Sequence, residues 1–301
     1  MSLNEPIYKL KDWIIPHIDK LDFDLLSLNP DALSLLEKYP ERINWDLLCK
    51  NPNPKVISLL ERNPDKINWS NLSINPNAIS LLERNFDRIY WFNLSENENA
   101  LSLLEKNQDK IEWFTLALNR NANSLIEKNL DKINWDMLCT NPNAISILEK
   151  NKDKIINWFY LTNNPNAISL LQENQDKFRI EELSSNPNAI SLLEKNKYKL
   201  NWKFLSQNPN GLHILTENMN LIDWKYLSKN SGALSLLEKN QDKINWMYLS
   251  KNPAIFELDY EKMRENNMRL YEDLMKEVMK PSRVFKEYEC GYDYLEELFG
   301  D

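Results

Sequence analysis

The chain has 301 residues, 42% hydrophobic and 27% charged, with a formal net charge of −8. The acidic balance disfavours a general nucleic-acid-binding surface, which needs clustered lysine and arginine, although it is compatible with a local basic groove. No apolar run approaches the roughly 18 residues of a membrane span. Met1–Lys11 lacks the basic segment followed by an apolar segment that is typical of a secretory signal. Cys49, Cys139 and Cys290 are too few and scattered for a disulfide framework or zinc site, so a reducing, intracellular setting is expected.

Residues 1–20 precede the repeated part of the chain and are predicted to form an N-terminal cap. Pro6–Lys20 carries apolar residues such as Ile14 and Ile18, which indicate a capping helix interrupted at Pro16. A stack of repeats needs caps, because its end units would otherwise expose a packing face to water.

A unit of 22 residues recurs over residues 21–258, with single spacings of 24 and 23. Nine of the ten tryptophans mark the copies. A fixed period of this length is typical of stacked repeats, in which each unit contacts its neighbours. We number each unit from its marker as position 0. The markers are Phe23, Trp45, Trp69, Trp91, Trp113, Trp135, Trp158, Ile180, Trp202, Trp224 and Trp246.

Each unit is predicted to begin with a short helix of about six to eight residues, because apolar or small residues recur at −2, 0, +3 and +4. Asn or Asp at −1 is a good N-cap. The Asn-Pro pair at +6 and +7 ends this helix, since a residue before proline is pushed out of the α region, and starts the next. The asparagine at +6, such as Asn141, is expected to stack into a ladder that satisfies loop backbone groups.

Apolar residues at +9, +10, +12 and +13, as in Ala78 and Leu82, predict a second helix buried on two sides. Asn at +16, such as Asn85, is expected to adopt the left-handed conformation that ends a helix. The predicted fold class is all-α, an α-solenoid of about ten to eleven helix-turn-helix repeats with N- and C-terminal helical caps. A leucine-rich-repeat horseshoe is the alternative, because its repeat length is similar, but its alternating Leu-x-Leu signature is missing.

The tryptophan column is interpreted as the core seam between repeats. A buried Trp hides roughly 150–250 Å², and Trp135→Ala is expected to cost roughly 3–5 kcal/mol. Stacking of nucleotide bases on the column is the disfavoured alternative. Cys49 and Cys139 lie at +4, where other copies carry Ser or Ala, and are interpreted as small packing residues. Asn123 at the apolar +10 position is either exposed or bonded to a neighbouring backbone group.

Function is expected where the repeats differ, at +1, +2 and +5 of the first helix. If the first helices line one side of the superhelix, these residues form a ladder along it, and exposed aromatic rows are typical of protein interfaces. The alternative is that +1 and +2 pack against the adjacent repeat, and both interpretations stay open. The partner-binding candidates are Phe92, Phe114, Phe159, Tyr160, Phe204, Tyr226, Met247 and Tyr248.

Residues 259–301 are interpreted as a C-terminal helical cap or a docking element. Apolar residues at helical spacing from Tyr260 to Val278 predict one longer helix that ends before Pro281, and two further short helices follow it. The docking interpretation assigns partner recruitment to Arg283, Tyr292 and Tyr294.

The tandem Asn-Pro-Asn-Ala-Ile-Ser-Leu-Leu-Glu-Lys-Asn and Asp-Lys-Ile-Asn-Trp units resemble those of repeat proteins from mimivirus-like giant DNA viruses of amoebae. The ending Met279–Val284 with Gly291–Asp293 is similar to a C-terminal element of several such proteins. The resemblance covers nearly the whole chain. It implies the cytoplasm of an infected host cell, a virus factory or a virion as the setting, and no particular mechanism.

Few residues in the sequence are suited to catalysis, metal binding or phosphate binding. His17 and His213 have no ligand or nucleophile partner nearby, and four glycines leave no phosphate-cradling loop. Carboxylates recur with the repeat, which is typical of a solvated surface. We therefore expect no enzyme activity, no cofactor, no metal site and no nucleic-acid or membrane partner; the oligomeric state stays open.

The leading functional hypothesis is a non-enzymatic scaffold that binds a host or viral protein through the variable ladder. One alternative is an adaptor, in which the solenoid holds a target and the C-terminal element recruits other machinery. The other is a structural component of the virus particle or factory.

Overall fold

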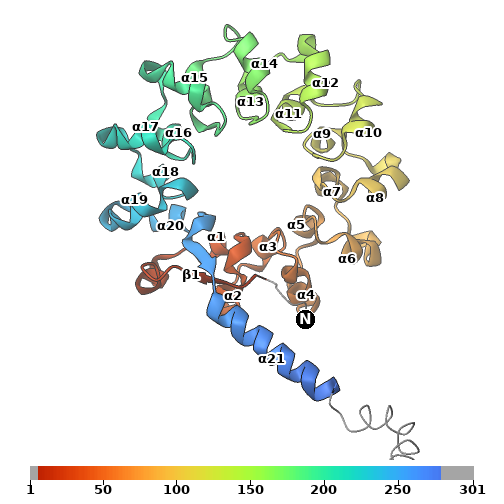
Figure 1. Ribbon diagram of the computed structural model, residues 1–301. Helices are drawn as coiled ribbons and strands as arrows, with labels where there is room; N and C mark the ends of the chain where they lie inside the picture. The colour runs from red at the N-terminus through yellow and green to blue at the C-terminus, as the bar shows by residue number, and fades with distance from the viewer. Residues whose placement is uncertain (1–5, 279–301) are drawn as a thin grey trace, which may run out of the picture. The chain divides into compact units, whose positions relative to one another are not determined.

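The computed structural model describes residues 6–278. The chain divides into two compact units, one of residues 10–256 and one of residues 1–9 with 257–301. The larger unit contains the repeats, which follow one another as pairs of short helices (Figure 1). The fold is all-α and solenoid-like, as predicted, and the described residues contain only the strands β1 (Tyr8–Leu10) and β2 (Phe256–Leu258). A horseshoe with a strand in every repeat is therefore excluded.

The first helix of each repeat is four to six residues long, shorter than predicted. In order these helices are α1 (Phe23–Ser27), α3 (Trp45–Leu48), α5 (Trp69–Ser73), α7 (Trp91–Glu96), α9 (Trp113–Leu116), α11 (Trp135–Thr140), α13 (Trp158–Thr162), the 3₁₀ helix η8 (Ile180–Ser185), α16 (Trp202–Ser206), α18 (Trp224–Leu227) and α20 (Trp246–Leu249).

The second helices are α2 (Leu33–Leu36), α4 (Lys55–Glu61), α6 (Ile79–Arg84), α8 (Leu101–Lys106), α10 (Asn123–Glu127), α12 (Ile145–Lys150), α14 (Ile168–Glu173), α15 (Ile190–Glu194), α17 (Leu212–Thr216) and α19 (Leu234–Glu238). The 3₁₀ helices η2 (Pro30–Ala32) and η11 (Ser231–Ala233) lead into α2 and α19, and η13 (Pro253–Ile255) stands in place of a second helix after α20. Short 3₁₀ links join successive repeats: η3 (Pro40–Arg42), η4 (Pro64–Lys66), η5 (Phe86–Arg88), η6 (Gln108–Lys110), η7 (Lys152–Lys154), η9 (Lys197–Lys199), η10 (Met219–Leu221) and η12 (Gln241–Lys243).

Asparagine side chains carry most of the hydrogen bonding between repeats. The predicted N-caps are present, as where Asn134 Oδ1 accepts from the Met137 N–H at 2.9 Å. At +6, Asn141 Nδ2 donates to the carbonyls of Ala117 and Asn119 in the preceding repeat, both at 3.0 Å. The predicted ladder is confirmed, and it supplies the buried loop backbone with partners that it would otherwise lack.

A second asparagine ladder runs along the outside of the first. The side-chain amide at +8 donates to the +7 carbonyl of the preceding repeat, as Asn143 does to Arg120 at 2.9 Å. Asn123 follows the second of its two predicted alternatives, because its Nδ2 donates to the Asn143 carbonyl at 2.7 Å. Its Oδ1 is buried without a hydrogen-bond partner in the described structure.

The core consists of the +3 leucines rather than the tryptophans. Leu138 and its equivalents in every repeat are 0% exposed, and in most repeats the residues at +9, +12 and +13 of the second helix are buried as well. Among the marker tryptophans of the described repeats, only Trp158 is buried, at 8%. The tryptophan column is therefore not the fully buried core that was predicted: apart from Trp158, these side chains stay partly exposed at the start of their first helices.

The prediction of a left-handed asparagine at +16 is also wrong. Asn85 has φ −129° and ψ 52°, and its equivalents are similar. Its Nδ2 instead donates to the carbonyl of Leu81, four residues earlier, at 2.9 Å. The side chain thus satisfies a free carbonyl at the helix end without any residue at positive φ.

The last repeat contacts the first as any repeat contacts the next. In the regular pattern, the +4 side chain accepts from the −1 N–H of the following repeat, as Ser228 Oγ does from Asn245 at 2.9 Å. Ser250 Oγ, in the last repeat, accepts the equivalent bond from the N–H of Asp22, also at 2.9 Å. The eleven repeats therefore form a closed ring, and Figure 1 shows the path from α1 round to α20.

A second periodic contact also continues across this seam. The lysine at −3 lies over the tryptophan of the preceding repeat, as Lys243 does over Trp224 at 4.5 Å, and Lys20 lies over Trp246 at 5.2 Å. The segment predicted as an N-terminal capping helix is the 3₁₀ helix η1 (Ile15–Lys20), preceded by β1. Its His17 ring lies 4.7 Å from Trp246, so this segment bridges the first and last repeats.

The asparagine ladders stop at the seam. Asn29 Nδ2, which would donate to the last repeat, is buried without a hydrogen-bond partner in residues 6–278. Asp31 replaces the +8 asparagine and has no amide to donate, and burial raises the pKa of its carboxyl. The ring is thus closed by fewer hydrogen bonds at the seam than between other repeats.

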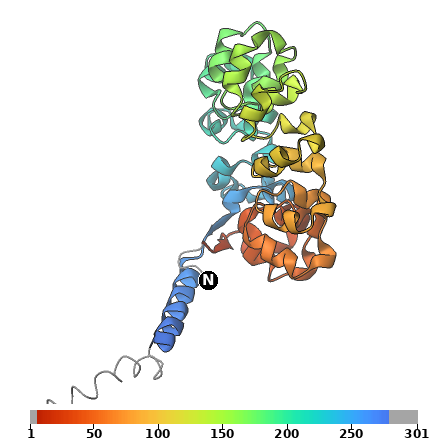
Figure 2. The ribbon, with the colours of Figure 1, turned by 90° about the vertical axis from the view of Figure 1, so that its right-hand side faces the viewer.

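The smaller unit contains the predicted long helix, α21 (Tyr260–Val278), which is drawn in blue in Figure 2. Within this unit, the Asp259 N–H donates to the Ile7 carbonyl at 2.8 Å, and Lys9 lies 3.7 Å from Glu257. None of the residues of α21 is buried. β1 and β2 pair in a two-stranded sheet.

Candidate interaction surface

The first helices lie on the inner side of the ring and the second helices on the outer side (Figure 1). With about 100° per residue, +1 and +5 lie roughly opposite the buried +3 leucine. These two positions therefore face away from the second helix, toward the inner side of the ring. The first helices thus line one side of the ring, which was the condition for the predicted ladder.

Position +1 presents large apolar side chains to solvent in several repeats. Phe92 and Met247 are each 53% exposed, and Phe114 and Phe159 are each 48% exposed. They differ from Asp46 and Ser70, which occupy the same position earlier in the chain. Position +1 thus combines exposure with variation between repeats, which is what a recognition surface requires.

Position +2 packs between repeats more than +1 does. Asn93 Nδ2 donates to the Ser70 carbonyl at 2.7 Å, and the hydroxyl of Thr115 donates to the Phe92 carbonyl at 2.7 Å. Tyr160 is partly buried beside Phe159, with 5.9 Å between ring centroids. In the first half of the ring, +2 therefore has a structural role.

In the last three repeats, the +2 aromatic residues form a continuous row of rings in edge-on or tilted contact. Phe204 and Tyr226 have ring centroids 6.4 Å apart, and Tyr226 and Tyr248 5.6 Å apart. Phe204 is 39% exposed, whereas the two tyrosines are partly buried. The structure thus brings three of the predicted binding residues into one row.

Lysines cover this row. Lys203 lies 4.8 Å from the centre of the Tyr226 ring, Lys225 lies 5.0 Å from Tyr248, and Lys229 lies 5.2 Å from Tyr226. Ammonium groups at such distances are attracted to the ring faces. Partial burial, followed by the neighbouring charge of Lys251, lowers the pKa of Lys229, although Tyr226 opposes this shift.

We name the set formed by Phe204, Tyr226, Tyr248, Lys203, Lys225, Lys229 and Lys251 the lysine–aromatic patch. Its aromatic members were predicted from the sequence as binding residues, whereas its lysines were not. The repeat spacing held the signal, since Lys203 and Lys225 both lie at +1 and Lys229 and Lys251 both lie at +5.

The two described cysteines fit the packing interpretation. Cys49 and Cys139 are free and buried, and Cys49 Sγ accepts from the Asn68 N–H at 3.3 Å in the place of the serine hydroxyl. Burial raises the pKa of the Cys139 thiol to about 12. A thiol at this position is protonated at neutral pH and is a poor nucleophile.

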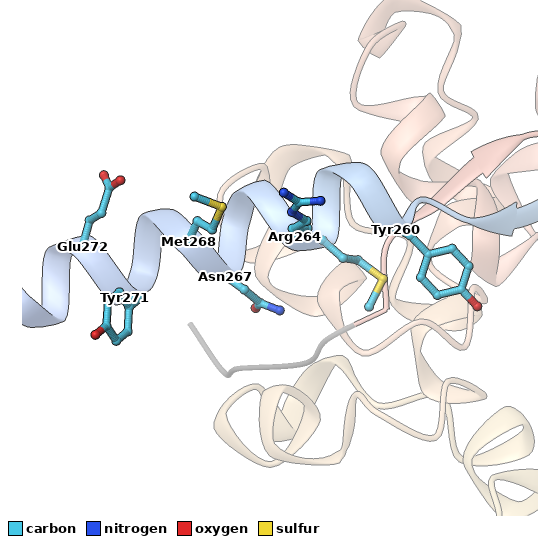
Figure 3. A pocket seen from close by; sticks show the side chains of 7 residues that line it. Tyr260, Arg264, Asn267, Met268, Tyr271 and Glu272 are labelled. Atoms are coloured by element: carbon cyan, nitrogen blue, oxygen red, sulfur yellow. The ribbon is translucent and has the colours of Figure 1, made fainter.

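On α21, a shallow surface hollow is lined by Tyr260, Arg264, Met268 and Tyr271 among others (Figure 3). Its residues come from one helix, and Figure 3 shows them pointing to different sides. The predicted docking residues Arg283, Tyr292 and Tyr294 lie outside the described residues.

Across residues 6–278, no group of three histidine, cysteine or acidic side chains is arranged to hold a metal ion. No helix in this range is long and apolar enough to cross a membrane. His213 Nε2 lies 2.8 Å from Glu194 Oε1 on the exposed surface. No protein-family model, curated protein or solved structure matches the chain.

Proposed function

We propose that the protein is a non-enzymatic scaffold that binds a protein partner along the inner side of the ring. The observation that carries this proposal is the exposure of Phe92, Phe114 and Phe159, each about half accessible, at a position that varies between repeats. Burying one such ring in an interface removes roughly 100 Å² or more of apolar surface from water, which favours association. We propose that this partner is a host or viral protein in an infected cell.

Affinity capture tests the proposal. The tagged protein is compared with the variant Phe92→Ser/Phe114→Ser/Phe159→Ser, which changes only inner-facing side chains. The control is Ile156→Ser/Tyr198→Ser/Leu221→Ser, whose side chains are 88%, 80% and 41% exposed outside position +1. A partner that is retained by the control and lost by the inner variant supports the proposal. Equal retention by both variants contradicts it.

An adaptor is the second candidate function, and α21 is the observation that favours it. Its Tyr260, Tyr271 and Leu274 are 72%, 63% and 56% exposed, which leaves a helix of the smaller unit with no buried side chain. Most helix stability in proteins comes from packing of an apolar face, so a partner that covers α21 would stabilise it. Deleting residues 259–301 should remove one subset of captured proteins for an adaptor, and none for a simple scaffold.

A further inference from the structure

The lysine–aromatic patch concentrates positive charge on an acidic protein. Lys203, Lys225 and Lys251 are exposed, and Lys229 is partly buried. Elsewhere lysines pair with carboxylates between repeats, as Lys197 does with Glu217 at 3.2 Å. Within the described residues, no carboxylate lies within ion-pair distance of the four patch lysines. Lys203, Lys225 and Lys229 contact ring faces, so an anionic ligand would add favourable interactions.

The patch has the repeat of an extended peptide. Its rings follow one another at 6.4 Å and 5.6 Å, and Lys203 and Lys225 occupy equivalent places in successive repeats. Side chains on one face of an extended strand recur every two residues, at about 6.6 Å. Alternate side chains of such a segment can therefore meet successive repeats. We propose that the patch binds an acidic segment of a protein partner in extended conformation, an inference that rests on the proposed scaffold function.

A peptide fits the patch better than a single-stranded nucleic acid. Bases bind such proteins by stacking on free ring faces. Here Lys203 and Lys229 both lie over the ring of Tyr226, and Lys225 lies over the ring of Tyr248. The ammonium groups present charge to the ligand, and they lie over ring faces on which a base would have to stack.

The test uses a fluorescent peptide of about twelve residues with alternating glutamate and serine, long enough to span roughly 40 Å. Matched probes replace glutamate by lysine, or the peptide by an oligothymidine of similar length. The variant is Lys203→Gln/Lys225→Gln/Lys229→Gln. The control, Lys128→Gln/Lys195→Gln/Lys239→Gln, removes the same number of charges from exposed sites on or next to the second helices.

Binding of the glutamate peptide should weaken about tenfold in the patch variant and less than about twofold in the control, and it should weaken with added salt. The lysine peptide should not bind. The inference is overturned if the glutamate peptide does not bind, if both variants bind it equally, or if oligothymidine binds more tightly. A partner captured through Phe92, Phe114 and Phe159 would still support the scaffold in those cases, so the two proposals can fail separately.

Discussion

The two sides of each first helix have opposite properties. The side that faces the second helix carries a fully buried leucine at +3 in every repeat, and it is followed at +6 by an asparagine that makes two buried hydrogen bonds in every repeat but the first. The inner-facing side carries residues as different as aspartate, phenylalanine, lysine and methionine at +1, and most of them are exposed. Burial and hydrogen bonding allow few residue types on the first side. Almost any residue type is tolerated on the second side, because it faces solvent.

This comparison separates residues that maintain the ring from residues that can recognise a partner. It predicts that substitutions on the stacking side reduce stability and leave the inner surface chemistry unchanged. Substitutions at +1 should change the inner surface chemistry and leave stability nearly unchanged. The predictions below run from the largest expected loss of stability to the smallest.

Leu138→Ala should give the largest effect, a loss of about 3 kcal/mol in the free energy of unfolding, because the side chain is 0% exposed and leaves a cavity. Phe114→Ala, at a site 48% exposed, should change stability by less than about 0.5 kcal/mol. Urea unfolding monitored by circular dichroism measures both. Similar losses for the two variants would contradict the division between the sides.

Asn141→Ala should cost about 2 kcal/mol, because two buried carbonyls lose their donor and the Asn143 N–H loses its acceptor. Asn143→Ala removes one exposed hydrogen bond to the Arg120 carbonyl and should cost about 0.5 kcal/mol. The pair has matched chemistry and differs in burial. Equal unfolding midpoints would show that the inner ladder adds nothing beyond the outer one.

Alkaline pH should destabilise the ring through Cys139. Burial raises the pKa of its thiol from 9.0 to about 12, so the unfolded chain loses this proton at lower pH than the folded one. The stability contribution is complete below pH 9 and falls as the pH rises from there, by about 1.4 kcal/mol for a full unit. Unfolding at pH 8 and pH 10 should therefore show a larger loss for the wild type than for Cys139→Ser, in which serine matches the common +4 residue. Parallel losses would argue against a buried thiol.

Ser250→Ala tests the closed ring with the smallest effect. Its hydroxyl accepts the bond from the Asp22 N–H across the seam, so the variant should lose about 1 kcal/mol, as Ser228→Ala should inside the stack. In an open solenoid Ser250 would have no following repeat. The ring would then be in doubt if Ser228→Ala were destabilising and Ser250→Ala neutral.

Much of the stacking side could be predicted from sequence because its interactions are local or strictly periodic. The caps at −1, the helix boundary at Asn-Pro and the ladder at +6 follow from the preferences of single residues repeated every 22 positions. The tryptophan was misassigned because large aromatic residues are so often buried. Here the space between repeats is filled by leucine side chains, and most of the indole rings stay partly exposed. The conformation of Asn85 was misassigned because a side-chain bond to the Leu81 carbonyl replaced the expected turn.

The sequence by itself determined the repeat unit, the helix pairs and the positions where repeats differ, since each depends on neighbours a few residues away or one period away. Only the tertiary structure decided that the repeats close on themselves, because closure depends on the small rotation between successive units summed over the whole stack, to which no single residue points. The same closure placed Ser250 beside Asp22, far apart in the chain. The packing of neighbouring first helices likewise gathered Lys203, Lys225 and Lys229 around one row of rings, and so created the surface that we propose for recognition.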